Sequence, residues 1–104
     1  MNENEISIRA AVLDEAKAIV TQDRCEQYGE PEDSFRVIAK MWTAYLQGIG
    51  GDFENGDELD EADAAIMMVL LKVARASTAI EPKRDNYIDM AGYAACAAEL
   101  EERK

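Results

Sequence analysis

The chain has 104 residues, of which 48% are hydrophobic, and 22 acidic residues against 11 basic ones give a net charge of −11. This length and composition fit one folded domain rather than a disordered segment. The acidic excess argues against direct binding to a nucleic-acid backbone and against an anionic membrane surface. It allows a cation site, a basic protein partner or simple solubility.

The residue types also limit the chemistry. The sequence has no histidine, which excludes His-based acid–base chemistry and favours an all-oxygen metal site over a zinc site. Its two cysteines, Cys25 and Cys96, have no motif spacing, and its first residues do not form a signal peptide. The longest apolar run, Ala64 to Leu71, is too short to span a membrane. We therefore expect a cytoplasmic protein with free thiols and no membrane partner.

Helical spacing begins near the start of the chain. Residues 1–6 are polar and are expected to fray. Apolar residues then recur every three or four positions from Ile8 to Val20, which predicts a first helix. A second helix should begin at Pro31, whose ring suits the first helical position, and its apolar stripe continues to Leu46.

Two apolar helices follow an acidic loop. Residues 48–58 hold four of the six glycines; they fail the calcium-loop pattern because the glycine offset is wrong and the closing Glu is missing. Asp60 is a candidate N-cap for a third helix that ends near Thr78, and a fourth helix covers residues 83–101. Both helices are apolar almost all round, which favours burial against other helices or a second copy.

These elements predict an all-α fold with no strand. Four helices with short connections over residues 1–104 indicate a single four-helix bundle-like domain. The two apolar helices further predict a homo-oligomer, either a dimer or a tetramer.

Two aspartates at the start of the fourth helix are the leading site candidates. Asp85 and Asp89 lie one turn apart on a strip that continues through Gly92 and Cys96. Carboxylates that point towards a core must be paired, protonated or bound to a cation. The pair therefore predicts an inward polar site. The alternative is an ordinary helix start, where the dipole favours acidic residues.

Other polar residues extend this candidate site. Asp63 heads a further apolar stripe, and Glu32 lies in the first turn of the second helix. Lys72 and Arg75 stand three residues apart on apolar surface and would offset the charge of phosphates. The acids would hold a hydrated Mg²⁺ or Mn²⁺. The alternative for the two cations is extension along apolar surface to solvent.

Two sequence blocks carry a resemblance to known proteins. The first covers residues 21–35 and continues to Leu46, and the second runs from Met67 to Tyr93. They look like a family of short, uncharacterised phage and prophage proteins. That family is in turn similar to the all-alpha nucleoside triphosphate pyrophosphohydrolases, the MazG-like and dimeric dUTPase group.

The resemblance implies a helical dimer or tetramer in a bacterial host cell, with Mg²⁺-dependent cleavage of a nucleotide between its alpha and beta phosphates. In that group Glu-x-x-Glu and Glu-x-x-Asp motifs hold the metal, and this chain departs from both. Asp85 and Asp89 stand near the second motif with a different residue and spacing. Glu58-x-x-Glu61 matches the first by letter, but it falls in the loop before the third helix and is discounted.

The resemblance suggests a role for each candidate. Asp85 and Asp89 would be catalytic and would bind the metal, assisted by Asp63 or Glu32. The residues expected to bind the nucleotide, by contact with phosphates or by stacking on a base, are Lys72, Arg75, Lys83, Arg84, Asn86, Tyr28 and Tyr93.

Two alternatives to a pyrophosphohydrolase stay open. A non-catalytic protein that sequesters a nucleotide signal of host defence would need the pocket and the cations but no metal cluster. An acidic protein-interaction inhibitor would mimic nucleic acid towards a basic host protein, and for this role the net charge of −11 would lie in continuous outer bands.

Overall fold

The computed structural model describes residues 3–23, 29–51 and 58–104. In chain order the elements are α1 (Glu3–Ala18), the π-helical turn η1 (Ile19–Asp23), α3 (Pro31–Gly48), α4 (Glu61–Thr78) and α5 (Arg84–Glu102). The expected all-α, bundle-like fold is confirmed, with four α-helices and no strand in the described ranges. None of the described helices combines the length and the apolar composition needed to span a membrane.

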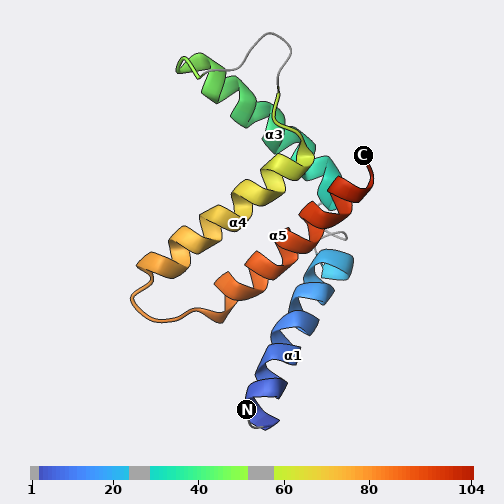
Figure 1. Ribbon diagram of the computed structural model, residues 1–104, viewed down its shortest axis with the longest axis vertical. Helices are drawn as coiled ribbons and strands as arrows, with labels where there is room; N and C mark the ends of the chain where they lie inside the picture. The colour runs from blue at the N-terminus through green and yellow to red at the C-terminus, as the bar shows by residue number, and fades with distance from the viewer. Residues whose placement is uncertain (1–2, 24–28, 52–57) are drawn as a thin grey trace.

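The α4–α5 pair is the centre of the fold. These two helices run antiparallel, joined by residues 79–83, and their contact is the most extensive between any two helices described (Figure 1). α3 packs mainly against α4, and α1 packs against α5. Because α3 and α1 extend beyond opposite ends of the pair, the molecule is elongated, with extents of 53 × 30 × 24 Å.

Local sequence signals set where α3 and α4 begin. Pro31 lies in the first turn of α3, directly after Glu30, whose backbone is extended. At α4, the Asp60 carboxylate accepts a hydrogen bond from the Asp63 backbone N–H at 2.8 Å, and the Asp63 carboxylate accepts one from the Asp60 N–H at 2.9 Å. This reciprocal capping box confirms Asp60 as the N-cap.

Two helix ends differ from the sequence expectation. α1 begins at Glu3 rather than near Ile8, so the backbone of residues 3–6 is helical where fraying was expected. The first helix also ends earlier, because the π-helical turn begins at Ile19. Residues 52–57 of the predicted loop lie outside the described residues.

Small side chains allow the helices to approach closely. Ala39, Ala64 and Ala65 are at most 2% exposed where α3, α4 and α5 meet. Phe35 and Cys96 complete the centre of this core cluster. No large side chain among the described residues is completely buried. The core of one chain is therefore thin, so individual polar contacts around it matter to stability.

The buried hydroxyl of Thr43 links α3 to the segment that leads into α4. It donates a hydrogen bond to the Ala39 carbonyl at 2.8 Å and accepts one from the Leu59 N–H at 2.9 Å. Valine would keep the shape of Thr43 but would leave that N–H without this partner. We expect Thr43→Val to lower the free energy of unfolding by about 1–3 kcal/mol, measured by urea denaturation followed by circular dichroism.

Thr78→Val is the matched control. The Thr78 hydroxyl donates to the Ala74 carbonyl at 3.1 Å on an exposed part of α4. We expect this variant to change the free energy of unfolding by less than about 0.5 kcal/mol. Equal losses at the two positions would contradict the linking role of Thr43.

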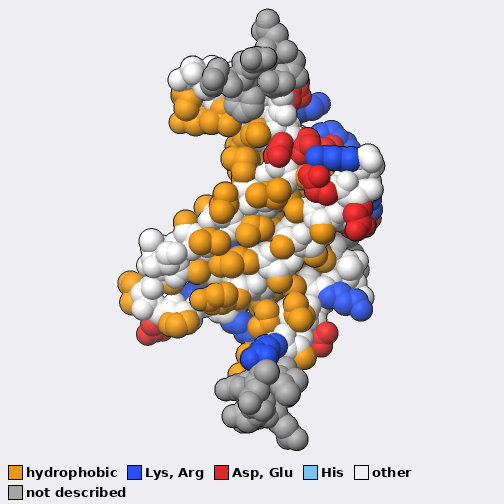
Figure 2. Space-filling model, viewed as in Figure 1, with side chains coloured by type: hydrophobic (Ala, Val, Ile, Leu, Met, Phe, Trp, Pro, Cys, Tyr) orange, Lys and Arg blue, Asp and Glu red, His pale blue; other side chains and the backbone are white. Residues whose placement is uncertain are grey.

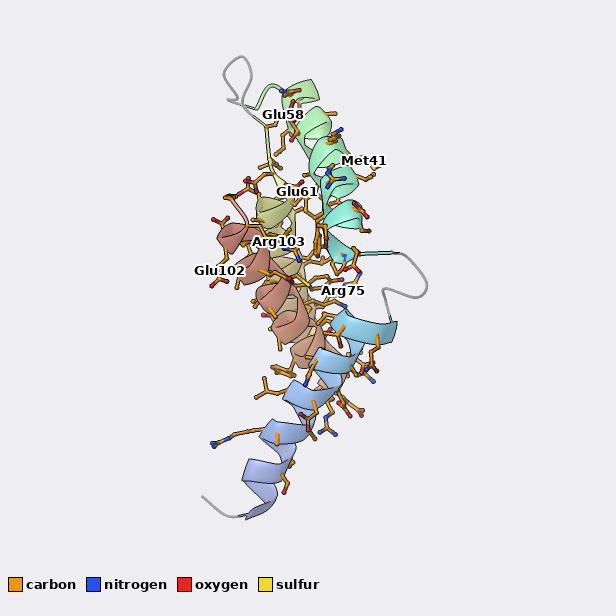
Figure 3. All side chains as sticks on the ribbon, turned by 90° about the vertical axis from the view of Figure 1, so that its right-hand side faces the viewer. Met41, Glu58, Glu61, Arg75, Glu102 and Arg103 are labelled. Carbon is orange, nitrogen blue, oxygen red and sulfur yellow. The ribbon has the colours of Figure 1, made fainter. Side chains whose placement is uncertain are left out.

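Ion pairs tie the end of α5 to the starts of α3 and α4. Arg103 Nη1 lies 3.0 Å from Glu32 Oε1, and Lys104 Nζ lies 2.7 Å from Asp60 Oδ2 (Arg103 is labelled in Figure 3). A backbone N–H bond and the Arg103 contact hold the pKa of Glu32 below its ordinary 4.5. The hydrogen bond from Lys104 holds the pKa of Asp60 below its ordinary 3.8. Folding therefore favours the ionised form of both carboxyls.

This arrangement predicts a loss of stability in acid. A carboxyl whose pKa is lowered by folding stabilises the protein above its unfolded pKa, and that stability is lost as the pH falls through the folded pKa. We expect the Tm to fall as the pH drops below 4.5, the ordinary pKa of Glu32, and to fall less steeply in Glu32→Gln. Thermal denaturation across this pH range measures the pH dependence of the Tm in the wild type and in the variant. Glu81→Gln, at an exposed position between α4 and α5, should behave as the wild type; an identical pH dependence in Glu32→Gln would contradict the prediction.

Candidate functional site

A cavity of about 280 Å³ lies between η1, the start of α3 and the middle of α5. Its lining is mostly apolar and includes Ile19, Phe35, Met68 and Ile88. Among the described residues that line it, Asp89 alone carries a charge. The volume is close to the lower end of the range for ligand cavities, which is about 300–1,000 Å³.

Asp89 forms an ion pair with Lys72 between α4 and α5. Lys72 Nζ lies 2.8 Å from Asp89 Oδ2, and each side chain is 14% exposed. Lys72 thus supplies the partner that an inward carboxylate requires. The alternative in which Lys72 extends to solvent is wrong for this residue. The carboxylate at the wall of this apolar cavity is therefore balanced by a lysine of α4 that does not itself line the cavity.

Two aromatic rings complete this wall. Phe35 from α3 and Tyr93 from α5 lie with ring centroids 5.9 Å apart and planes at 67°, an edge-to-face contact. Both rings line the cavity. Because Phe35 is buried and Tyr93 is half-buried, the contact holds Tyr93 in place while part of its ring stays accessible.

Asp85 does not share the environment of Asp89, which corrects the expectation that both point inward. Asp85 is exposed in the first turn of α5. It lies on the same strip of the helix as Asp89, but at the end of the α4–α5 pair, where neighbouring helices do not cover it. The helix-dipole alternative accounts for its position. The neighbouring Asn86 is 9% exposed and takes the buried position instead.

The other predicted cations lie at the surface. Arg75, Lys83 and Arg84 are exposed, and Arg84 Nε lies 3.5 Å from Glu15 Oε2 of α1. Figure 3 shows Arg75 on the side of the α4–α5 pair that also carries α1 and α3. Tyr28 lies outside the described residues, so its role stays a prediction.

The four carboxylates expected to hold a metal lie in separate settings. Glu32 pairs with Arg103, Asp63 belongs to the capping box, Asp89 pairs with Lys72, and Asp85 is exposed. Over residues 3–23, 29–51 and 58–104, no group of three or more Asp, Glu or Cys side chains is placed to hold a metal ion. The described residues therefore do not fit a Mg²⁺ or Mn²⁺ held by the protein itself, and no catalytic step is derived through one.

Gly92 is a site residue to which sequence reasoning assigned no role. A Cβ at this position would lie 3.1 Å from Val20 Cγ1, so the glycine allows η1 to approach α5 beside the cavity. A glycine inside an otherwise apolar helix was the available signal, because glycine there destabilises the helix unless a close approach requires it. The π-helical turn that carries Val20 has no comparable signal in the sequence.

Comparison with known proteins shows the family to which the chain belongs. The profile of a family described as Domain of unknown function (DUF6378) matches residues 11–101. The chain belongs to this family. Two curated relatives are each 33% identical to the DUF6378 chain: the Gene 55 protein of Mycobacterium phage D29, over 88% of this chain and 54% of that protein, and the Gene 55 protein of Mycobacterium phage L5, over 81% and 48%.

The DUF6378 chain spans about half the length of these curated relatives, and no solved structure matches it. The expected resemblance to a family of phage proteins of unknown function is confirmed. The further likeness to the MazG-like group stays a prediction.

Breaking the Lys72–Asp89 pair should destabilise the protein. Lys72→Met leaves the Asp89 carboxylate largely buried without its cation, and Asp89→Leu leaves the Lys72 ammonium without its anion. We expect each single variant to lower the free energy of unfolding by about 2–4 kcal/mol, and the double variant to recover part of that loss. Urea denaturation of the four proteins measures this cycle.

Lys40→Met, at an exposed position on α3, is the control for loss of a lysine charge. Its free energy of unfolding should change by less than about 0.5 kcal/mol. If the two single losses simply add in the double variant, Lys72 and Asp89 do not stabilise each other and the pair has no energetic role.

Proposed function

We propose that this chain binds a nucleotide in the cavity beside Asp89 and releases it unchanged. The observation that supports this most is the composition of the cavity wall: apolar side chains, the ring of Tyr93, and one ion-paired carboxylate. Small-molecule sites commonly combine an apolar cavity with a few convergent polar groups. A nucleobase is a flat, largely apolar ligand with hydrogen-bond donors at its edge, so it matches this wall.

The base would lie in the apolar part of the cavity. Tyr93, supported by its edge-to-face contact with Phe35, would stack on the base. The Asp89 carboxylate has several acceptor positions, of which Lys72 uses part, and the others would accept from an amino or ring N–H of the base. Asn86, buried one turn earlier on α5, is not among the residues that line the cavity, so it would not contact the base.

The phosphates would extend towards the start of α5. Lys83 and Arg84 are exposed there, and the helix dipole at an N-terminus favours anions. Because the chain carries a net charge of −11, a triphosphate would bind best with Mg²⁺ or Mn²⁺ on its own phosphates. In this proposal the metal arrives with the nucleotide and is not held by a cluster of protein carboxylates.

Binding without turnover agrees with the separate settings of the acidic residues. Cleavage between alpha and beta phosphates, as the resemblance implies for the MazG-like group, uses carboxylates gathered around Mg²⁺. Here Glu32, Asp63 and Asp89 are each engaged by a different partner. Sequestration of a nucleotide signal needs only the cavity and the nearby cations.

Titration calorimetry against ribo- and deoxynucleoside mono- and triphosphates, with Mg²⁺ present, tests the proposal. We expect one nucleotide to bind per chain. Tyr93→Leu should weaken that binding by about 10- to 100-fold, because stacking on an aromatic side chain contributes about 1–3 kcal/mol per base. Tyr45→Leu, at an exposed position of α3 away from the cavity, is the matched control and should bind as the wild type.

Chromatography of the incubated nucleotides separates binding from turnover. Recovery of the nucleotide intact agrees with the proposal. A monophosphate and pyrophosphate that form with the wild type and not with Asp89→Asn would replace it with a pyrophosphohydrolase. If no nucleotide binds, the proposal fails.

A further inference from the structure

One face of the α4–α5 pair is apolar and uncovered. On α4 the side chains of Ile66, Leu70 and Val73 recur at helical spacing and are 47%, 61% and 43% exposed, and Tyr87 of α5 is 51% exposed. α1 and α3 pack on the other side of the pair, around the cavity. Figure 2 shows hydrophobic side chains that run across α4 and α5 on the near side.

Small residues continue this surface on α5. Ala94 and Ala98 are exposed and follow Tyr87 at helical spacing, on the side of α5 that adjoins the exposed row of α4. The outer face is defined by these residues together: Ile66, Leu70, Val73, Tyr87, Ala94 and Ala98. It places a row of large side chains on one helix beside a row of alanines on the other.

The area of the chain indicates how much surface is left uncovered. The accessible surface is 7501 Å², whereas a compact monomer of this mass exposes about 5,800 Å². The radius of gyration is 15.8 Å, against about 13 Å for a compact domain of this length. The excess of about 1,700 Å² is spread over the elongated chain, the projecting ends of α1 and α3 included, and the outer face contributes to it. A stable interface buries roughly 800 Å² on each partner, so a contact of that size is available.

We propose that the outer face binds the same face of a second copy of this chain, which makes the protein a homodimer around the α4–α5 pair. A two-fold axis would place the α4 row that contains Leu70 on one copy against Ala94 and Ala98 of α5 on the other copy. The same contact would form a second time with the roles of the two copies exchanged. The large side chains of one copy would then fill the shallow groove that the alanines leave on the other copy. The pairing yields a four-helix bundle of two stacked α4–α5 pairs, with the two cavities on opposite outer sides.

Charge also favours this face for self-association. Each chain carries a net charge of −11, so two copies repel one another over most of their surface. The residues that define the outer face carry no charge, and the nearby Lys72 is neutralised by Asp89. Two chains can therefore meet here without placing like charges in contact. This inference does not depend on the proposed nucleotide site.

Sedimentation equilibrium of the wild type and of Leu70→Glu tests the proposal. At about 100 μM protein, which saturates a dimer with a Kd of ~1 μM, the wild type should have about twice the monomer mass of 11.5 kDa. Leu70→Glu should raise the dimer Kd at least about 100-fold, because the symmetric contact buries two unpaired carboxylates. Circular dichroism should show unchanged helicity, since Leu70 is 61% exposed within one chain.

Met41→Glu is the matched control. Met41 is a 66% exposed apolar residue of α3, outside the outer face (labelled in Figure 3), and its variant should remain dimeric. A monomeric wild type at the same concentration overturns the proposal and leaves the face to a different protein. A dimer that resists Leu70→Glu and dissociates with Met41→Glu overturns it as well, because the contact is then on α3. Since the first of these results uses only the wild type, the test does not depend on the folding of a variant.

Discussion

The close antiparallel contact of α4 with α5 organises the structure, because α3 packs mainly against α4 while α1 and η1 pack against α5. Buried alanines of the core cluster let α3, α4 and α5 approach closely, and the Lys72–Asp89 pair connects α4 to α5. A buried ion pair stabilises little unless its geometry is good, but it is expensive to break. The loss expected on breaking the pair is therefore larger than the stability that the intact pair adds.

The α4–α5 contact gives the two sides of the pair different properties. On one side α1, η1 and α3 surround a cavity whose wall includes Asp89 and Tyr93. On the other side no described helix covers the apolar residues of α4 and α5, among them Ile66, Leu70 and Tyr87. α4 and α5 carry more apolar surface than the other helices of one chain can bury. The thin core of alanines and the broad apolar exterior both follow from this.

Polar contacts at the ends of the helices connect the end of α5 to the starts of α3 and α4. The capping box of Asp60 and Asp63 sets the start of α4, and Lys104 pairs with Asp60 from the end of α5. Arg103 makes the equivalent connection to Glu32 at the start of α3. Two acids that sequence reasoning assigned to a metal, Glu32 and Asp63, thus have structural partners. Sequence patterns do not separate such roles, since an acid in a first turn satisfies the helix dipole equally well.

The sequence alone is enough to predict the four α-helices. Pro31, Asp60 and the spacing of apolar residues set the starts of α3 and α4 because caps and amphipathic stripes are local properties. It also identified Asp89 as an inward carboxylate that needed a partner. That this partner is Lys72 is seen only in the fold, because the two residues are on different helices and their pairing depends on register. The fold is also needed to see that Asp85, on the same strip as Asp89, is exposed, since burial depends on what packs against a helix and not on the helix alone.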